Sequence, residues 1–180
     1  TLGEAGHSKS ILDASNPGGE VLGIDADHEA IEVSNSRLSE YQDRFISVND
    51  NFKNLKKIAM KSNFIPPHGI LFDLGVSSLQ LNIESRGFSF KRKSPLDMRF
   101  SFNQKLTADQ VVNTFDENEI ADILYHLGEE RKARQIAKVI VNNRPIKYAD
   151  ELAELIKKNV RNTNYKINPA TKTFQALRIY

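Results

Sequence analysis

The sequence predicts an α/β fold in its first half and a small helical domain in its second half. Up to residue 76, short apolar runs alternate with amphipathic segments. This alternation is typical of a parallel sheet whose strands are joined by right-handed helical crossovers. Beyond that point, amphipathic segments follow one another with no apolar run between them. We therefore interpret the second half as a helical domain inserted after the third strand.

Three strands are expected, and they are evenly spaced along the chain. Asp25, Asn49 and Asp73 stand at their carboxyl ends. Each occupies the same place in its strand–helix unit, at the edge where open α/β sheets bind ligands. The third run, ILFDLG, is apolar enough for burial on both faces. The expected strands span residues 19–25, 44–50 and 70–75.

Helices are expected where apolar residues recur at helical spacing between capping residues. Asp27 can cap the helix after the first strand, because its side chain can accept a hydrogen bond from a first-turn N–H group. Asp116 and Glu119 have the spacing of a capping box, and Gly128 ends the same segment. The expected helices span residues 8–14, 27–38, 51–63, 116–128, 129–144 and 149–160.

The composition is that of a soluble globular protein. The chain has 180 residues, of which 39% are hydrophobic and 27% charged. This length suits one domain, or one domain with a sizeable insertion. There is no cysteine, which excludes a disulfide scaffold and a thiolate zinc site. No signal-peptide pattern is found, and no apolar run is long enough to span a bilayer.

Basic residues are concentrated in two stretches, although the net charge is only +2. Residues 155–180 carry six basic residues and no acidic one, and residues 86–105 carry six against one. An anionic partner explains such stretches, and a solvated lysine-rich surface is the alternative. The second stretch also contains four phenylalanines, and aromatic rings beside cations suit single-stranded RNA. The alternative is that the rings anchor a long loop to the core.

The opening segment TLGEAGHS, together with Asp25, predicts a cofactor site. Gly3 and Gly6 let the backbone approach a ligand closely. An acid about 20 residues further on, at the end of the next strand, can accept hydrogen bonds from both ribose hydroxyls. This indicates a nucleoside-containing cofactor, although neither a G-x-G-x-x-G fingerprint nor a P-loop lysine is present. A plain strand-to-helix turn followed by a helix-capping acid is the alternative.

Asp73 begins the segment DLGVSSLQL at the end of the third expected strand. A carboxylate beside the expected cofactor crevice can bind a cationic or amine-bearing group, or accept a proton. Capping of the following turn is the alternative. The four histidines, at positions 7, 28, 68 and 126, lack the spacing of metal ligands, so no metal site is expected.

Six motifs occur in order along the chain: TLGEAGHS, GIDAD, ILFDLGVSSLQL, RGFSF followed by PLDMR, GEERKARQIAKVI, and PATKTFQALRI. In these motifs the chain resembles the family of ribosomal RNA small-subunit methyltransferase H, also called MraW, which includes mitochondrial relatives. The resemblance covers essentially the whole chain. It implies an S-adenosylmethionine-dependent enzyme that methylates the N4 amine of a cytidine in small-subunit ribosomal RNA near the decoding centre.

The resemblance also implies a fold and its division into domains. The fold would be a Rossmann-like S-adenosylmethionine-dependent methyltransferase sheet, incomplete here, with an inserted small helical domain. Residues 1–76 would be the first part of the methyltransferase core, 77–170 the substrate-recognising insert, and 171–180 the return to the core. Family members have a strand before this opening loop and continue past the equivalent of Tyr180, so we expect the chain to be truncated at both ends.

Matching the motifs residue by residue implies the members of the site. The cofactor contacts would be Ala5, Gly6, His7, Asp25, Phe52, Asp73 and Gln80. Phe52 would pack on the adenine. Asp73 is the candidate catalytic acceptor of the amine proton, since the D/N-P-P-Y/F motif of many amine methyltransferases is missing. The expected RNA contacts are Arg86, Lys91, Arg92, Lys93 and Arg99.

A few positions depart from the family pattern. Ala5 stands where the family usually has glycine, and Glu4 is bulkier than usual, which bears on how closely the loop approaches the cofactor. Asn168 stands where a histidine is usual, and Lys172 where arginine is common.

The expected partner is small-subunit ribosomal RNA, with neither a membrane nor a metal, and the oligomeric state is left open. A bacterial cytoplasm is the expected location, with a mitochondrion as the alternative. Two other functions stay open. One is a methyltransferase of the same fold acting on another RNA base or a protein amine. The other is a non-catalytic RNA-binding or ribosome-assembly factor, against which the intact Gly3, Gly6, Asp25 and Asp73 argue.

Overall fold

The computed structural model of the protein describes residues 2–41, 43–160 and 168–180. They fall into two compact units. The first contains residues 1–79 and 100–102, and the second contains residues 80–99 and 103–180. Thr1, Arg161 and Lys166, which belong to segments that the sequence singled out, lie outside the described residues.

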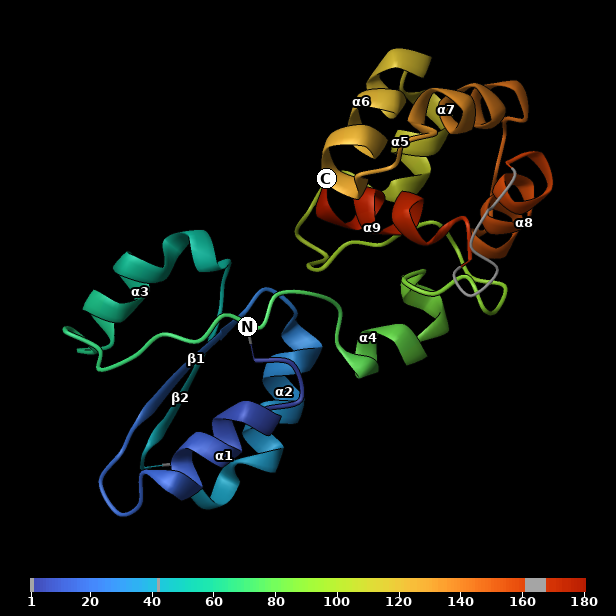
Figure 1. Ribbon diagram of the computed structural model, residues 1–180. Coiled ribbons are helices and arrows are strands. Elements are labelled where there is room, and N and C mark those ends of the chain that lie inside the picture. Colours follow the sequence, from blue (N-terminus) through green and yellow to red (C-terminus); the bar gives the residue numbers. More distant parts are fainter. Residues whose placement is uncertain (1, 42, 161–167) are drawn as a thin grey trace. The chain divides into compact units, whose positions relative to one another are not determined.

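The first unit is built on two parallel strands. β1 (Val21–Asp25) and β2 (Phe45–Asn49) are paired so that Asp25 lies opposite Asn49. The helical elements of this unit are α1 (Gly6–Ala14), α2 (His28–Arg37), η1 (Ser39–Tyr41), η2 (Phe52–Asn54) and α3 (Leu55–Lys61). Helices α1 and α2 cover one face of the strands, and α3 lies on the other side (Figure 1). The expected strand–helix–strand crossover is confirmed.

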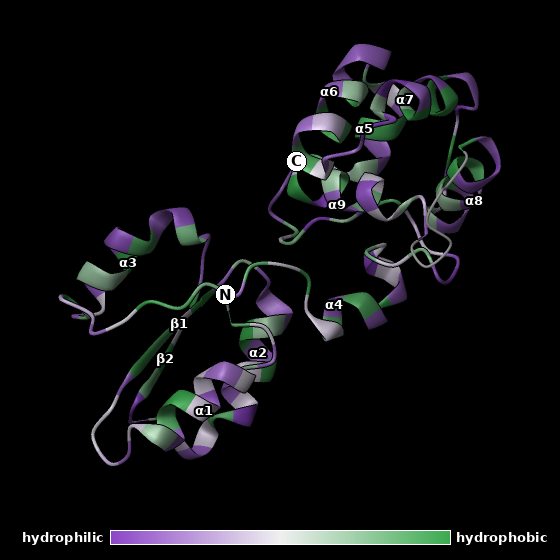
Figure 2. Ribbon diagram, in the orientation of Figure 1, coloured by the Kyte–Doolittle hydropathy of each residue, from purple (hydrophilic) through white to green (hydrophobic). Residues whose placement is uncertain are grey.

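The core of the first unit lies where α1 and α2 pack against the strands. Its buried residues are Leu2, Ala5, Leu12, Ile31, Leu38 and Phe45. Figure 2 shows the matching hydrophobic colouring along β1 and β2. Burying one large apolar side chain contributes about 1.5–3 kcal/mol. The expected cap of α2 is also confirmed, since the side chain of Asp27 accepts a hydrogen bond from the N–H of Glu29.

The expected third strand is wrong. Residues 70–75 form no strand, and Ile70, Leu71, Phe72 and Leu74 are each half exposed or more. A strand needs a neighbouring strand to pair with its backbone N–H and C=O groups. Within the described ranges, β1 pairs with β2 alone, and no strand lies beside residues 70–75. Apolar character by itself therefore does not make this segment a strand.

The second unit is helical, as expected. Its elements are η3 (Glu84–Arg86), α5 (Ala108–Thr114), α6 (Glu117–Gly128), α7 (Ala133–Asn142), α8 (Ala149–Asn159) and α9 (Thr171–Ile179), while α4 (Ser78–Asn82) spans the division between the units. The capping box of α6 is confirmed, with both hydrogen bonds between Asp116 and Glu119 at 2.9 Å. Among the described helices, none is both long and apolar enough to cross a membrane.

Helix α5 was not expected from the sequence, although a signal for it is present. Thr107 and Gln110 form a second capping box, in which Thr107 Oγ1 accepts from the N–H of Gln110 and Gln110 Oε1 accepts from the N–H of Thr107. The spacing T-x-x-Q before an apolar pair is the signature of this motif. The aromatic and basic residues that precede it drew our interpretation toward a long loop.

Helix α9 packs against α6, and a glycine makes this close approach possible. A Cβ atom on Gly128 would lie 2.6 Å from the carbonyl oxygen of Lys172 and 3.0 Å from Cβ of Ala176. Residues 171–180, which we expected to return to the methyltransferase core, therefore belong to the helical unit in the described chain. The expected division of the complete fold into domains stays a prediction.

We expect Gly128→Ala to lower the free energy of unfolding by about 2 kcal/mol, because an added methyl group would overpack the α6–α9 contact. The measurement is urea unfolding followed by circular dichroism. Gly69→Ala is the control, because a Cβ atom there meets nothing within 4 Å. A loss of stability at position 69 equal to that at position 128 would contradict this account of the helix contact.

Candidate functional site

The candidate site in the first unit is organised by the carboxylate of Asp25, at the end of β1. Its Oδ2 accepts hydrogen bonds from the backbone N–H groups of Leu2 at 2.9 Å and Gly3 at 3.1 Å. Its Oδ1 accepts one from the N–H of Asp27 at 2.9 Å. A carboxylate has about four acceptor positions, so about one remains for a ligand. Asp25 thus holds the loop at the strand end and keeps the capacity to bind a hydroxyl group.

Further hydrogen bonds hold the loop against α2. Ser34 Oγ donates to the carbonyl oxygen of Gly3 at 3.1 Å, and Arg37 Nη1 donates to that of Glu4 at 2.9 Å. The side chain of Glu4 is also engaged, because its Oε1 accepts from the N–H of Leu79 at 3.1 Å. The bulk of Glu4 is therefore used to tie the loop to a later part of the same unit.

Ala5 has a backbone conformation that favours glycine. Its φ is 60° and its ψ is 21°, and its side chain is fully buried. The left-handed conformation costs an L residue about 1 kcal/mol, while burying the methyl group contributes about 0.8 kcal/mol. The two effects nearly cancel, which explains how alanine is accommodated where the family that the sequence resembles has glycine. Because Ala5 as a whole is 0% exposed, its predicted contact with the cofactor stays a prediction.

His7 and Asp73 face each other beside this loop. His7 Nδ1 lies 3.3 Å from Asp73 Oδ2, and the two side chains are 68% and 65% exposed. Gly6 and His7 are also the first two residues of α1, so backbone N–H groups with no partner in the helix lie at the same place. A helix N-terminus favours a carboxylate, and a carboxylate such as Asp73 favours an ammonium group. Together they can hold the α-amino acid end of a ligand.

Phe52 and Phe72 form an exposed aromatic pair after β2. Their ring centroids are 6.0 Å apart in a T-shaped arrangement, and the residues are 46% and 50% exposed. The place of Phe52 is set by Asn51, whose side chain caps η2 by accepting from the N–H of Lys53 at 2.9 Å. An exposed ring of this kind can stack on a planar base. The sequence did not point to Phe72, because we expected it inside a buried strand.

Six of the seven predicted cofactor residues belong to the first unit, and Gln80 is buried in the second. Asp25 is the last residue of β1 and Phe52 comes shortly after the end of β2, as expected. Asp73 is placed by its contact with His7 instead of by a strand end. Within the described ranges, no group of His, Cys, Asp and Glu could hold a metal ion.

We call residues 86–105 the basic loop. Two of the five predicted RNA-binding residues are used for the structure of this loop itself. Arg86 is 2% exposed, and its Nη2 donates to the carbonyl oxygen of Arg99 at 3.0 Å. Arg99 in turn forms an ion pair with Asp97 at 2.7 Å and donates to the carbonyl oxygen of Gln104. A buried guanidinium cannot reach an RNA phosphate without unpacking, so we assign Arg86 a structural role in place of the expected RNA contact.

The remaining three predicted cations, Lys91, Arg92 and Lys93, are exposed. Arg92 pairs with Glu84 at 2.7 Å, and Lys93 Nζ lies 4.2 Å from the ring centroid of Tyr148. Exposed ion pairs of this kind contribute only about 0–1 kcal/mol. These cations can therefore exchange their present contacts for an anionic ligand at little cost.

Some phenylalanines of the basic loop are packed in the protein interior, whereas others are exposed. Phe88 is 1% exposed, and the rings of Phe90 and Phe174 pack 4.8 Å apart in the helical unit. Phe102 is 60% exposed. The alternative that these rings anchor a loop is therefore confirmed for Phe88 and Phe90.

Comparison with known proteins decides the family. Residues 1–180 match the model of the MraW methylase family. The chain belongs to the MraW methylase family. A ribosomal RNA small subunit methyltransferase H from Dehalococcoides mccartyi is 50% identical over 179 residues, which cover 99% of this chain and 51% of the relative. Proteins of the same name from Mycoplasma mycoides and Thermomicrobium roseum are 46% and 43% identical, with 59% and 56% of their lengths covered. The chain thus spans about half the length of the curated relatives it matches.

We expect Asp25→Asn to lower the free energy of unfolding by about 2 kcal/mol, because a charged acceptor of several N–H groups is replaced by a neutral amide. Hydrogen exchange at the amides of Leu2 and Gly3 should accelerate as well. Both effects are measured against Glu32→Gln, an equal change of charge at an exposed residue of α2. Unchanged exchange at Leu2 and Gly3 in Asp25→Asn would show that the carboxylate does not hold the loop.

The ion pair of Asp97 predicts a dependence of stability on pH. Burial raises the pKa of this carboxyl, but hydrogen bonds from Arg99 and its positive charge outweigh burial and hold the pKa below 3.8. A depressed pKa stabilises the fold above the unfolded-state pKa, and this contribution is lost as the pH falls through the folded-state pKa. Asp97→Asn should therefore flatten the fall in unfolding free energy below about pH 4. Asp122→Asn, at an exposed position, should leave that fall unchanged.

Proposed function

We propose that the protein is an S-adenosylmethionine-dependent methyltransferase that modifies the N4 amine of a cytidine in small-subunit ribosomal RNA near the decoding centre. The observation that carries this proposal is the family match over residues 1–180. Relatives that are 43–50% identical bear the name ribosomal RNA small subunit methyltransferase H. These relatives come from bacteria, which supports a bacterial cytoplasm as the place of action.

The chemistry of the first unit fits S-adenosylmethionine. Asp25 has an acceptor position left for a ribose hydroxyl, and Phe52 offers an exposed ring for the adenine. The start of α1 suits the carboxylate of the methionyl end. Binding of its ammonium group is the alternative role for Asp73, in place of a role at the reacting amine. When bound, the cofactor supplies an electrophilic methyl group. A Rossmann-like methyltransferase sheet would contain β1 and β2 as two of its parallel strands.

Asp73 has the chemistry needed at the reacting amine. The lone pair of the cytosine amine is delocalised into the ring, so an acceptor that holds an amine hydrogen favours the pyramidal, nucleophilic nitrogen. The same carboxylate oxygen can take the proton that the nitrogen loses when its new bond to carbon forms. Asp73 is exposed, and the imidazole of His7 beside it can share that proton. Most of the rate acceleration would come from positioning the two reactants.

RNA binding is assigned to the exposed cations of the basic loop. Lys91, Arg92 and Lys93 lie on the surface of the helical unit, where they can contact phosphates. The target base has to leave its stack before an enzyme can act on its amine. Cations that hold the flanking backbone stabilise that unstacked arrangement.

The test uses the full-length protein with labelled S-adenosylmethionine and small ribosomal subunits that lack the modification. We expect label in N4-methylcytidine after digestion to nucleosides. Asp73→Ala should lower kcat/KM at least about 100-fold, the usual contribution of an acid–base group. Asp43→Ala is the matched control, because Asp43 is an exposed acid of the same unit.

Each other outcome selects a different function. Label in another nucleoside or in protein would favour a methyltransferase of the same fold with another acceptor. If the protein binds S-adenosylmethionine but transfers no label to the ribosomal subunits, a different methyl acceptor would be favoured. If the full-length protein neither bound the cofactor nor transferred label, a ribosome-assembly factor would be favoured. Equal activity of Asp73→Ala and Asp43→Ala would remove Asp73 from the mechanism.

A further inference from the structure

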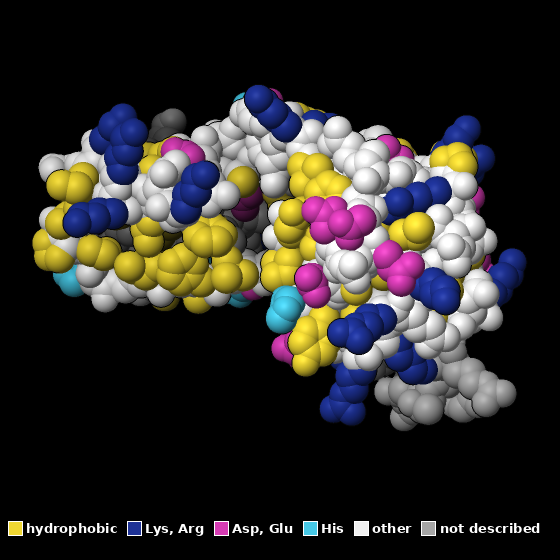
Figure 3. Space-filling view, turned by 90° about the horizontal axis from the view of Figure 1, so that it is seen from above, with side chains coloured by type: hydrophobic (Ala, Val, Ile, Leu, Met, Phe, Trp, Pro, Cys, Tyr) yellow, Lys and Arg dark blue, Asp and Glu magenta, His cyan; other side chains and the backbone are white. Residues whose placement is uncertain are grey.

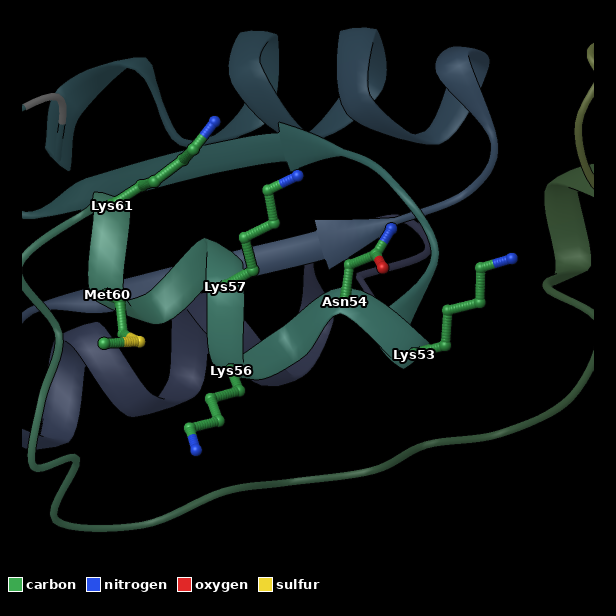
Figure 4. A pocket seen from close by; sticks show the side chains of 6 residues that line it. All are labelled: Lys53, Asn54, Lys56, Lys57, Met60 and Lys61. Atoms are coloured by element: carbon green, nitrogen blue, oxygen red, sulfur yellow. The ribbon is translucent and has the colours of Figure 1, made fainter.

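Four of the six residues that line a shallow hollow on α3 and η2 are lysines. Its volume is about 390 Å³, and it is lined by Lys53, Asn54, Lys56, Lys57, Met60 and Lys61. Figure 4 shows the four lysine side chains pointing in different directions around Asn54 and Met60. We call this feature the lysine hollow. Neither the cofactor contacts nor the basic loop includes any of its residues.

The lysine hollow has a positive charge that Asp50 offsets only in part. The sequence contains no Asp or Glu from Asn51 to Phe72. All four lysines are exposed, and none has an ion pair within 4.0 Å among the described residues. The nearest acid in sequence is Asp50, whose Oδ1 is engaged by the N–H of Asn51 and by Asn54 Nδ2. Hydrogen bonds from Asn54 and Asn51, assisted by the charges of Lys57 and Lys53, hold the pKa of Asp50 below its usual range.

The lysine hollow begins directly beside the candidate cofactor site. Phe52, the ring proposed to pack on adenine, and Lys53, the first lysine of the hollow, are successive residues of η2. Figure 3 shows dark-blue cationic side chains beside yellow hydrophobic ones on the part of the first unit that contains α3, at the left of the view. Phe52 is thus the neighbour in sequence of the first lysine of the hollow, but it is not among the residues that line the hollow.

We propose that the lysine hollow binds the phosphate backbone of the RNA substrate beside the nucleotide that is methylated. This inference rests on the proposed function, and it adds a second RNA contact in a different unit from the basic loop. Flexible lysines each reach a phosphate without fixed geometry, which suits contacts that do not depend on sequence. The exposed Met60, at 61%, adds apolar surface among these charges, as in grooves that bind single strands.

The type of cation favours RNA over an acidic protein. Protein interfaces are enriched in arginine and depleted in lysine, whereas all the cations from Asn51 to Phe72 are lysines. A planar carboxylate partner would also be matched best by the bidentate fork of arginine. A chain of phosphates needs only positive charge along its path, which the four lysines supply.

The experiment measures RNA binding by the full-length protein with all four lysines of the hollow changed to glutamine, K53Q/K56Q/K57Q/K61Q. The probe is a fluorescent single-stranded RNA that contains the decoding-centre cytidine. Each phosphate contact on a single strand contributes about 0.7 to the slope of log affinity against log salt, so the slope should fall by about 3. The affinity should fall roughly 100-fold at about 0.15 M salt.

Two matched variants separate the lysine hollow from net charge. R131Q/R134Q/K138Q/K147Q removes the same charge from exposed cations of the helical unit that lie outside both basic stretches, and it should keep most of the affinity and the slope. A variant with arginine in place of all four lysines of the hollow keeps the charge, so it should bind RNA about as well as the wild type. The affinity for S-adenosylmethionine, measured by calorimetry, should be equal in all variants, which also shows that the cofactor site remains folded.

Several results would overturn the inference. Equal losses in the two glutamine variants would mean that only net charge matters. Unchanged RNA binding, with weaker binding to assembled subunits, would assign the hollow to an acidic ribosomal protein. Failure of the proposed function is a separate result, because it is read from the nucleoside that the wild-type protein methylates. If the wild type forms N4-methylcytidine but the glutamine variant of the hollow binds RNA normally, only the inference about the hollow fails.

Discussion

The hydrogen bonds from the backbone of Leu2 and Gly3 to the carboxylate of Asp25 are the constraint on which the candidate site depends. They connect the opening loop to the end of β1. The start of α1, the conformation of Ala5 and the contact of His7 with Asp73 all lie in or next to that loop. A charged acceptor that binds several N–H groups is among the stronger polar interactions in proteins. One side chain thus shapes the ligand loop and remains able to bind a ligand.

Cations serve different purposes in the two units. In the basic loop, Arg86 and Arg99 bind backbone carbonyl groups and an acid, and so they shape the loop. In the lysine hollow of α3, the cations stay exposed and have no ion pair among the described residues. Guanidinium groups have several donors in a planar fork and suit buried structural roles. Ammonium groups are more strongly hydrated and stay at the surface.

Much of the fold could be predicted from the sequence, because the deciding signals are local. The caps at Asp27 and Asp116 and the end of α6 at Gly128 depend on residues a few positions apart. The absence of the third strand could not be predicted, since strand formation depends on a partner that lies far away in sequence. Of the cofactor residues, Asp25 followed from spacing alone, whereas Phe72 and the burial of Arg86 became visible only in the folded chain.

The sequence by itself determined the family, the capping residues of several helices and the residue types available for chemistry. These are properties of motifs and of neighbouring residues, whose hydrogen bonds and periodicity are set within one or two turns of chain. Only the tertiary structure decided which cations are buried and which are free to bind an anion. It also decided that Asp73 meets His7 instead of ending a strand. Burial and contact depend on which distant segments pack together, and no local pattern encodes that choice.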